Sequence, residues 1–286
     1  MKLVFNLLLA IMLFSVSNDA LAHPGSGIVV DRHGNIYFVD TGSGVWKIDR
    51  NGKLTRLSGP AYHWMTIDLD GRLKNVTLPY FASEDATITR VGADPTLLLS
   101  SDFPVVVGKD GSLYYPWLSV GKQLQIFRLN PSGTTTAMKT LTANTAGETL
   151  RWLNGMAIGP DSSLYFSENR AIKRITSEGK LTTIVDNVTL SGCDSVPEVG
   201  ANLGAYFRGL DVDAKGSVYV AVTGCRAVLK ISADKKVETI LRASPPWSPT
   251  GVAVFGSDVY VLEYFHTPGD NRREWLPRVR KISSDG

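Results

Sequence analysis

The chain alternates short apolar runs with polar turn residues over most of its length. The clearest copy of this pattern lies between Asn154 and Val185, where the apolar runs are Met156–Ile158, Leu164–Phe166, Ala171–Ile175 and Leu181–Val185. Each run is too short for a helix and is bounded by Gly, Asp, Ser or Asn, which predicts a strand. Pro fixes φ and Gly, Asp and Asn tolerate positive φ, so the separators predict hairpin turns. The segment therefore predicts one small antiparallel sheet of four strands.

The same unit recurs through the chain. Further copies begin at or near Gly27, Trp64, Pro104, Gly209 and Thr250. One such sheet cannot bury both of its faces, and a fixed repeat indicates that successive sheets stack on one another. Six sheets arranged radially around a channel bury every face without leaving long bare edges. We therefore predict an all-β fold, a six-bladed β-propeller with four-stranded antiparallel blades; an open sandwich is the alternative.

The last unit shows three apolar runs before the chain stops at Gly286. Two endings fit this pattern. Residues near His23 supply a fourth strand that closes the ring, or the last blade is incomplete.

The first residues have the pattern of a secretory signal. Lys2 precedes the apolar run Leu3–Phe14, and Ala20-Leu21-Ala22 places small residues where signal peptidase cuts. This predicts a signal peptide over residues 1–22 and a single propeller domain over residues 23–286, secreted or periplasmic after cleavage following Ala22. An uncleaved anchor is the alternative. No later apolar stretch is long enough to span a bilayer, so we do not expect an integral membrane protein.

Charge and cysteine content narrow the range of partners. The net charge is +3 and there is no block of Lys or Arg, which argues against nucleic acid as a partner. The chain has two cysteines, Cys193 and Cys225. Export would bring them into an oxidising compartment, and both lie in connections expected at one face of the fifth sheet. We therefore predict a disulfide between them; a free thiol or a metal pair is the alternative.

Two segments carry a resemblance to a known superfamily. They are GIVVDRHGNIYFVDTGSGVWKIDRNGKLTRLSG, from Gly27, and GLDVDAKGSVYVAVTGCRAVLKISADKK, from Gly209. Both resemble NHL-repeat propellers and the related gluconolactonase and regucalcin-like propellers. The resemblance extends from Gly27 to the C-terminus, and it implies a six-bladed propeller. It says less about chemistry, because such propellers include binding modules, scaffolds and some enzymes.

In the lactonase branch, the resemblance implies a divalent cation such as calcium at the channel mouth, held by oxygen ligands. Asn154 matches the family's asparagine ligand, although an Asx turn accounts for it equally well. Ser26 stands where that branch has an acidic ligand, and Arg208 stands where it has an aspartate. A guanidinium repels a cation. We therefore expect no metal cofactor, and a divalent cation held by other carboxylates is the alternative.

Aromatic residues precede several of the predicted inner strands. The segments are Tyr62-His63-Trp64, Arg151-Trp152-Leu153-Asn154, Tyr206-Phe207-Arg208 and Trp247-Ser248-Pro249-Thr250. Converging at one opening, they predict a site for a flat or apolar ligand with an anionic group, with His63, Trp64, Trp152, Asn154 and Arg208 as candidate ligand-binding residues. Packing of these aromatics between blades is the alternative.

The predicted second strands end in acidic residues. These are Asp40, Glu168 and Glu263, and His266 follows the last of them within the long insertion Phe265–Pro277. Glu263 and His266 are therefore further candidates for the mouth, with possible acid–base roles. The alternatives are that such carboxylates tie down their own loops and that the insertion is a lid that binds nothing.

These patterns favour a binding module over an enzyme. We predict an exported NHL-like propeller that binds a small molecule at the channel mouth or a protein partner at the blade tops. The alternative is a lactonase-like hydrolase that depends on a divalent metal and has a degenerate metal site. A structural interaction partner would instead show an apolar patch on one face.

Overall fold

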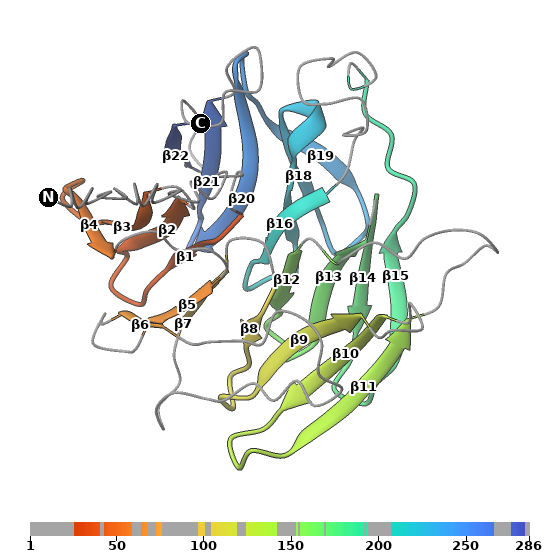
Figure 1. The fold of residues 1–286 in the computed structure, drawn as a ribbon. Helices are drawn as coiled ribbons and strands as arrows, with labels where there is room; N and C mark the ends of the chain where they lie inside the picture. Colours follow the sequence, from red (N-terminus) through yellow and green to blue (C-terminus); the bar gives the residue numbers. More distant parts are fainter. Residues whose placement is uncertain are drawn as a thin grey trace, which may run out of the picture.

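The computed structural model describes most of the repeat region of the chain. The described residues are 26–40, 43–58, 64–67, 73–75, 97–100, 104–118, 124–141, 153, 155–168, 170–191, 193, 207–265 and 276–283, with backbone only at 58, 64–67, 73–75, 100, 117 and 118. They form strands and one short 3-10 turn, η2 (Thr223–Cys225). The strands pair into six antiparallel sheets. The predicted six-bladed β-propeller is confirmed (Figure 1).

Four of the sheets have the expected four strands in meander order. The first contains β1 (Ile28–Val30), β2 (Ile36–Asp40), β3 (Gly44–Ile48) and β4 (Leu54–Ser58). The third contains β8 (Val106–Val107), β9 (Leu113–Leu118), β10 (Leu124–Leu129) and β11 (Thr135–Leu141). The fourth contains β12 (Gly155–Ile158), β13 (Leu164–Glu168), β14 (Ala171–Ile175) and β15 (Leu181–Val185). The fifth contains β16 (Phe207–Val212), β17 (Val218–Val222), β18 (Ala227–Ile231) and β19 (Val237–Arg242).

The other two sheets have three strands each among the described residues. The second contains β5 (Trp64–Ile67), β6 (Leu73–Asn75) and β7 (Leu97–Ser100), and the sixth contains β20 (Trp247–Phe255), β21 (Asp258–Phe265) and β22 (Pro277–Ile282). The predicted signal peptide and the residues near His23 lie outside the described residues. Completion of the sixth sheet by the N-terminus therefore stays a prediction.

The second sheet differs from the sequence prediction in its order. We expected the segment from Trp64 to form the innermost strand, but β5 lies in the middle of its sheet, between β6 and β7. The innermost strand is β7, which contacts both β1 and β8. The reason is packing: Leu99 fills the space against the first sheet, and Leu98 fills the space against the third.

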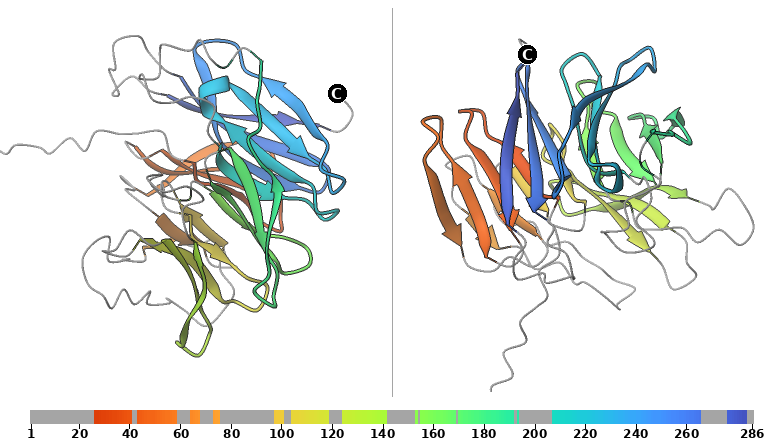
Figure 2. Two further views of the ribbon diagram at one scale, coloured as in Figure 1. Left: turned by 90° about the vertical axis from the view of Figure 1, so that its right-hand side faces the viewer. Right: turned by 90° about the horizontal axis from the view of Figure 1, so that it is seen from above.

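Apolar side chains hold each sheet against the next around the ring. Within the described residues there are six hydrophobic clusters, one at each junction between neighbouring sheets. The cluster that contains Phe38 and Leu262 joins the first sheet to the sixth, and these two sheets lie next to each other in Figure 2. At the same junction the Tyr264 hydroxyl donates to the Val39 carbonyl at 2.8 Å. The ring is therefore closed by side chains from opposite ends of the sequence.

In five of the six sheets, as described, a tyrosine of the second strand lies opposite the innermost strand. In the fifth sheet Tyr219 lies opposite Lys230, whose ammonium is 5.6 Å from the ring centroid, and its hydroxyl donates to Asp213 at 3.3 Å. The first sheet repeats this arrangement with Tyr37 and Lys47. In these two blades the cation–π contact and the turn aspartate fix the hairpin that follows the innermost strand.

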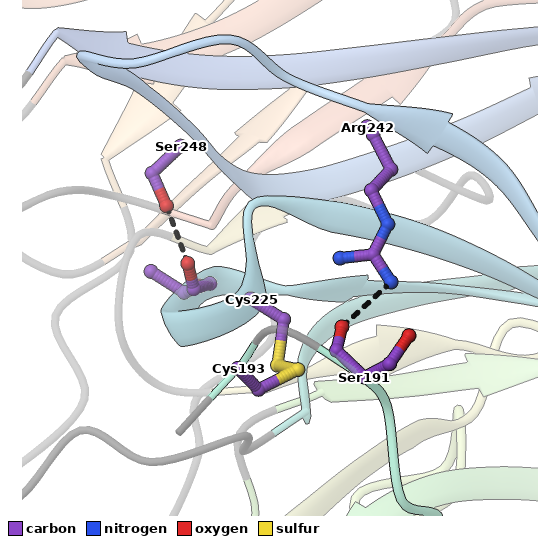
Figure 3. Close-up of a disulfide and its surroundings, with 6 residues drawn as sticks. Ser191, Cys193, Cys225, Arg242 and Ser248 are labelled. Carbon is purple, nitrogen blue, oxygen red and sulfur yellow. Dashed lines mark hydrogen bonds between the residues drawn. A yellow bond between two sulfur atoms is a disulfide. The ribbon is translucent and has the colours of Figure 1, made fainter. Parts of the chain in front are cut away.

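The predicted disulfide is confirmed. Cys193 and Cys225 are bonded, with their Cα atoms 4.5 Å apart, and both are buried. Figure 3 shows the bond tying the segment before β16 to the turn η2, with the Arg242 guanidinium donating to the Ser191 carbonyl beside it. The described part of the chain contains no helix with the length and apolar character that crossing a membrane requires.

Candidate functional site: the central channel

The innermost strands of all six sheets enclose one cavity. Its volume is about 410 Å³, and its lining includes residues of β1, β7, β8, β12, β16 and β20. Figure 1 shows these strands meeting near the middle of the molecule. The volume lies within the range of small-molecule sites in proteins. Valine, isoleucine, leucine and glycine dominate the wall, so the cavity offers apolar side chains to a ligand alongside polar groups.

Close backbone contacts between neighbouring innermost strands set the width of the channel near Gly155, Gly209 and Gly251. A Cβ added at Gly155 would lie 2.3 Å from the Arg208 carbonyl oxygen, and one added at Gly251 would lie 2.3 Å from the Ser26 carbonyl oxygen. A Cβ added at Gly209 would lie 2.8 Å from the Gly251 Cα. Glycine is needed at these positions because the strands approach too closely for any side chain.

Asp211 places a carboxylate in the wall of this apolar cavity. It lies on β16, lines the cavity and is partly exposed. One carboxylate oxygen accepts the Val254 backbone N–H from β20 at 2.7 Å, and the other accepts the Val212 N–H at 2.8 Å. An ionised carboxylate accepts about four hydrogen bonds in total, so these two leave acceptor capacity unused.

The surroundings of Asp211 disfavour its charge. Burial raises its pKa to about 6, the two backbone hydrogen bonds oppose that rise, and the negative charge of Asp213 adds to it. Asp110, in a turn, shows the contrast. Burial would also raise the Asp110 pKa, but hydrogen bonds from Ser112 and Arg128 outweigh burial and lower it.

Lys109 is the other charged residue among the described residues that line the cavity. It is exposed, and its ammonium donates to the Pro160 carbonyl in the fourth sheet. Asp211 belongs to the fifth sheet and Lys109 to the third. The cavity therefore carries charges of both signs on sheets that are not neighbours.

Several residues that the sequence singled out lie outside the described residues. They are His63, Trp152, Asn154 and His266, and only the backbone of Trp64 is described, so their role at the mouth stays a prediction. Arg208 is described: it precedes Gly209 on β16, it is partly buried, and its carbonyl accepts a hydrogen bond from the Ser167 hydroxyl at 3.2 Å.

The acidic residues that the sequence places at the ends of the second strands are held by neighbours in their own sheets. Both Arg278 and Arg280 donate to one oxygen of the fully buried Glu263, at 2.6 and 3.1 Å. Glu168 forms an ion pair with Lys173, and Asp40 accepts the Ser43 hydroxyl. The alternative from the sequence is that these carboxylates tie down their own loops; Glu263 and Glu168 instead pair with side chains on the next strand of their sheets.

Trp247 also packs within its own sheet. Its ring meets Phe265 edge to face, with the centroids 5.4 Å apart, and the Arg278 guanidinium lies 3.8 Å from its centroid. These contacts fix Trp247 beside the Glu263 ion pair.

The donor set at the described mouth does not suit a divalent cation. The residues that precede the innermost glycines are Ser26, Arg208 and Thr250, and Glu263 is already balanced by two guanidinium groups. No group of three or more His, Cys, Asp or Glu side chains is placed to hold a metal in the described ranges. A guanidinium cannot ligate a metal ion, and the one carboxylate of this described set is already paired.

The sequence analysis missed Asp211, although comparing the repeats with one another would have found it. Register places Asp211 opposite Tyr219, and the residues opposite the equivalent tyrosines in four other sheets are small and apolar: Val29, Val106, Ala157 and Ala253. A carboxylate is thus present in one sheet where four others have valine or alanine.

Comparison with known proteins extends the description of the fold. The sequence matches no protein-family model and no characterised protein sequence. A luciferin-regenerating enzyme has a similar structure, with 16% identity, 92% of each chain covered and a TM-score of 0.58. A gluconolactonase from Xanthomonas campestris has 15% identity, with 91% of this chain and 87% of that chain covered and a TM-score of 0.55.

A calcium-binding regucalcin from Agrobacterium tumefaciens has 16% identity, with 84% of this chain and 82% of that chain covered and a TM-score of 0.51. These similarities confirm the propeller fold expected from the resemblance. At such low identity they establish the fold alone.

Proposed function

We propose that this protein is an exported β-propeller that binds a small, largely apolar molecule in its central channel. The observation that carries the proposal is the cavity of about 410 Å³ enclosed by the six innermost strands. Its apolar side chains supply burial, and the polar groups of the wall, Asp211 and Lys109 among them, supply orientation, as in other small-molecule sites. Arg208, one of the mouth residues predicted from the sequence, directly precedes Gly209 in the cavity wall.

Export rests on two features of the chain. The pattern from Lys2 to Ala22 is that of a signal peptide, and the Cys193–Cys225 disulfide is a bond that persists in oxidising compartments. Together they favour a secreted or periplasmic protein. Sequencing the N-terminus of protein recovered outside the cytoplasm tests this, and we expect it to begin at His23.

A fluorescent probe tests binding in the channel. N-phenyl-1-naphthylamine is uncharged and fluoresces strongly in apolar surroundings, so titration should give a saturable signal. Val106→Phe should weaken binding several-fold because Val106 lines the cavity. Val237→Phe is the matched control, since Val237 lies on the outermost strand of the fifth sheet, and it should bind as the parent does. Equal affinity in both variants would refute a channel site.

A lactonase-like hydrolase that depends on a divalent metal is the alternative, since proteins of the same fold include a gluconolactonase and a calcium-binding regucalcin. That alternative predicts that calcium raises the melting temperature and that a chelator abolishes hydrolysis of gluconolactone. The binding proposal predicts an unchanged melting temperature with calcium and no hydrolysis. Either calcium-dependent result would favour the enzyme.

A further inference from the structure

Asp211 is a costly residue for the fold that it belongs to. The other four sheets compared above form the same innermost strand with valine or alanine at this position, so the ladder does not need a carboxylate there. Burying a carboxylate among apolar strands is unfavourable unless its charge is balanced. A residue that the repeat does not need, and that the cavity wall exposes, indicates a role in that cavity.

The groups around Asp211 do not balance its charge. Asp213, in the turn that follows β16, is negative, and Tyr219, on the neighbouring β17, donates to Asp213. Val254, on the facing strand β20, contributes a backbone N–H. Among the described lining residues Lys109 is the only cation, and the Pro160 carbonyl already accepts a hydrogen bond from its ammonium. The strands packed against Asp211 thus leave it without a facing cation within the described region.

We propose that the channel binds an amphiphilic amine, whose ammonium group pairs with the Asp211 carboxylate while its apolar body lies against the valine, leucine and isoleucine wall. This rests on the proposed function, since it names the ligand class of the same cavity. The unused acceptor sites on the carboxylate receive the ammonium N–H groups. Charge-assisted hydrogen bonds of this kind are about twice as strong as neutral ones, and the apolar surroundings strengthen them further.

Three probes with one apolar body and different head groups test this proposal. They are hexylammonium, hexanol and hexanoate, titrated by calorimetry near pH 8, where alkylammonium groups stay protonated because their pKa is about 10. We expect hexylammonium to bind at least about tenfold more tightly than the other two, since one charge-assisted contact is worth roughly that factor. Equal affinity for the three probes would overturn the proposal.

Variants assign the preference to Asp211. Asp211→Asn keeps an acceptor for the Val254 N–H and removes the charge, so it should abolish the preference for hexylammonium. Asp211→Ala installs the residue found at the equivalent positions of the fourth and sixth sheets. If Asp211→Asn does not fold, Asp211→Ala replaces it in the test and should likewise abolish the preference for hexylammonium. Asp213→Asn is the control for general electrostatics and should keep the preference. Preference retained in a folded Asp211 variant would overturn the assignment.

Acidification gives an independent readout. Near pH 5 a carboxyl group with a pKa of about 6 is roughly one-tenth ionised. Hexylammonium binding should therefore weaken about tenfold between pH 8 and pH 5 in the parent and stay constant in Asp211→Asn. Identical pH dependence in the two proteins would contradict the proposal.

The probes also separate this proposal from the one it rests on. Binding of hexanol and N-phenyl-1-naphthylamine without any preference for hexylammonium would contradict the amine proposal but would still support a binding site in the channel. Failure of every probe to bind would remove both.

Discussion

Asp211 shows how a single residue departs from the repeat that surrounds it. It shares its register with valine and alanine in four other sheets, yet it places an acid between the innermost strands of the fifth and sixth sheets. Its two backbone hydrogen bonds are too weak to restore an ordinary pKa. The physical consequence is that the folded protein holds this proton more tightly than the unfolded chain does.

This difference predicts an unusual dependence of stability on pH. The unfolded chain releases the Asp211 proton near pH 3.8 and the folded protein near pH 6. Between these values the folded state binds more protons, so the contribution of Asp211 is most favourable below pH 4 and is lost as pH rises to about 6. Relative to Asp211→Asn, the parent should lose about 1–3 kcal/mol of unfolding free energy between pH 4 and pH 7.

Urea unfolding of both proteins at the two pH values measures that loss. Other carboxyl groups, such as Asp110 and Asp161, have lowered pKa values and give the opposite trend, but they are common to both proteins and cancel in the comparison. Asp213→Asn is the control: it removes only the smallest cause of the raised Asp211 pKa, so its profile should stay closer to that of the parent than to that of Asp211→Asn. Parallel pH profiles for the parent and Asp211→Asn would show that the Asp211 pKa is ordinary.

At the scale of the strand, glycine decides how closely the innermost strands approach. Gly155, Gly209 and Gly251 lie on the innermost strands of three successive sheets, and each faces the backbone of a neighbouring blade. Hydrogen bonds accompany these contacts, from the Ser167 hydroxyl to the Arg208 carbonyl and from the Thr223 hydroxyl to the Pro249 carbonyl. The rim of the channel is therefore built from backbone contacts that a methyl group would disrupt.

Gly155→Ala tests this close approach. The added Cβ would lie 2.3 Å from the Arg208 carbonyl oxygen, so we expect a loss of about 3 kcal/mol in unfolding free energy, measured by urea denaturation. Gly133→Ala is the comparison, because its Cβ would meet nothing within 4 Å and its cost, at a φ of +89°, is about 1 kcal/mol. Equal losses in the two variants would argue against tight packing at the rim.

Most strands could be predicted from sequence because turn residues and short apolar runs are local signals. The segment from Trp64 shows the limit of this approach. Its pattern matched the repeat, but β7 is the innermost strand because Leu98 and Leu99 fill the gaps on both sides, and such long-range packing has no local signature. The partners of Glu263 were likewise missed, since Arg278 and Arg280 become neighbours only when β21 pairs with β22.

For the whole molecule, closure of the ring creates the site. The junction between the first and last sheets combines an apolar cluster with the Tyr264 to Val39 hydrogen bond, and it completes the wall of the channel. The sequence predicted such a ring and placed the ligand at its mouth. The cavity extends along the innermost strands as far as Asp211 and Lys109, beyond the mouth residues on which the sequence analysis concentrated.

The most direct measurement is a crystal structure of the mature protein soaked with 4-iodobenzylamine, whose iodine is located by its anomalous scattering. We expect the iodine inside the channel, enclosed by the six innermost strands, with the ammonium group within hydrogen-bond distance of the Asp211 carboxylate. Iodine bound outside the channel, with the cavity left to solvent, would contradict the account.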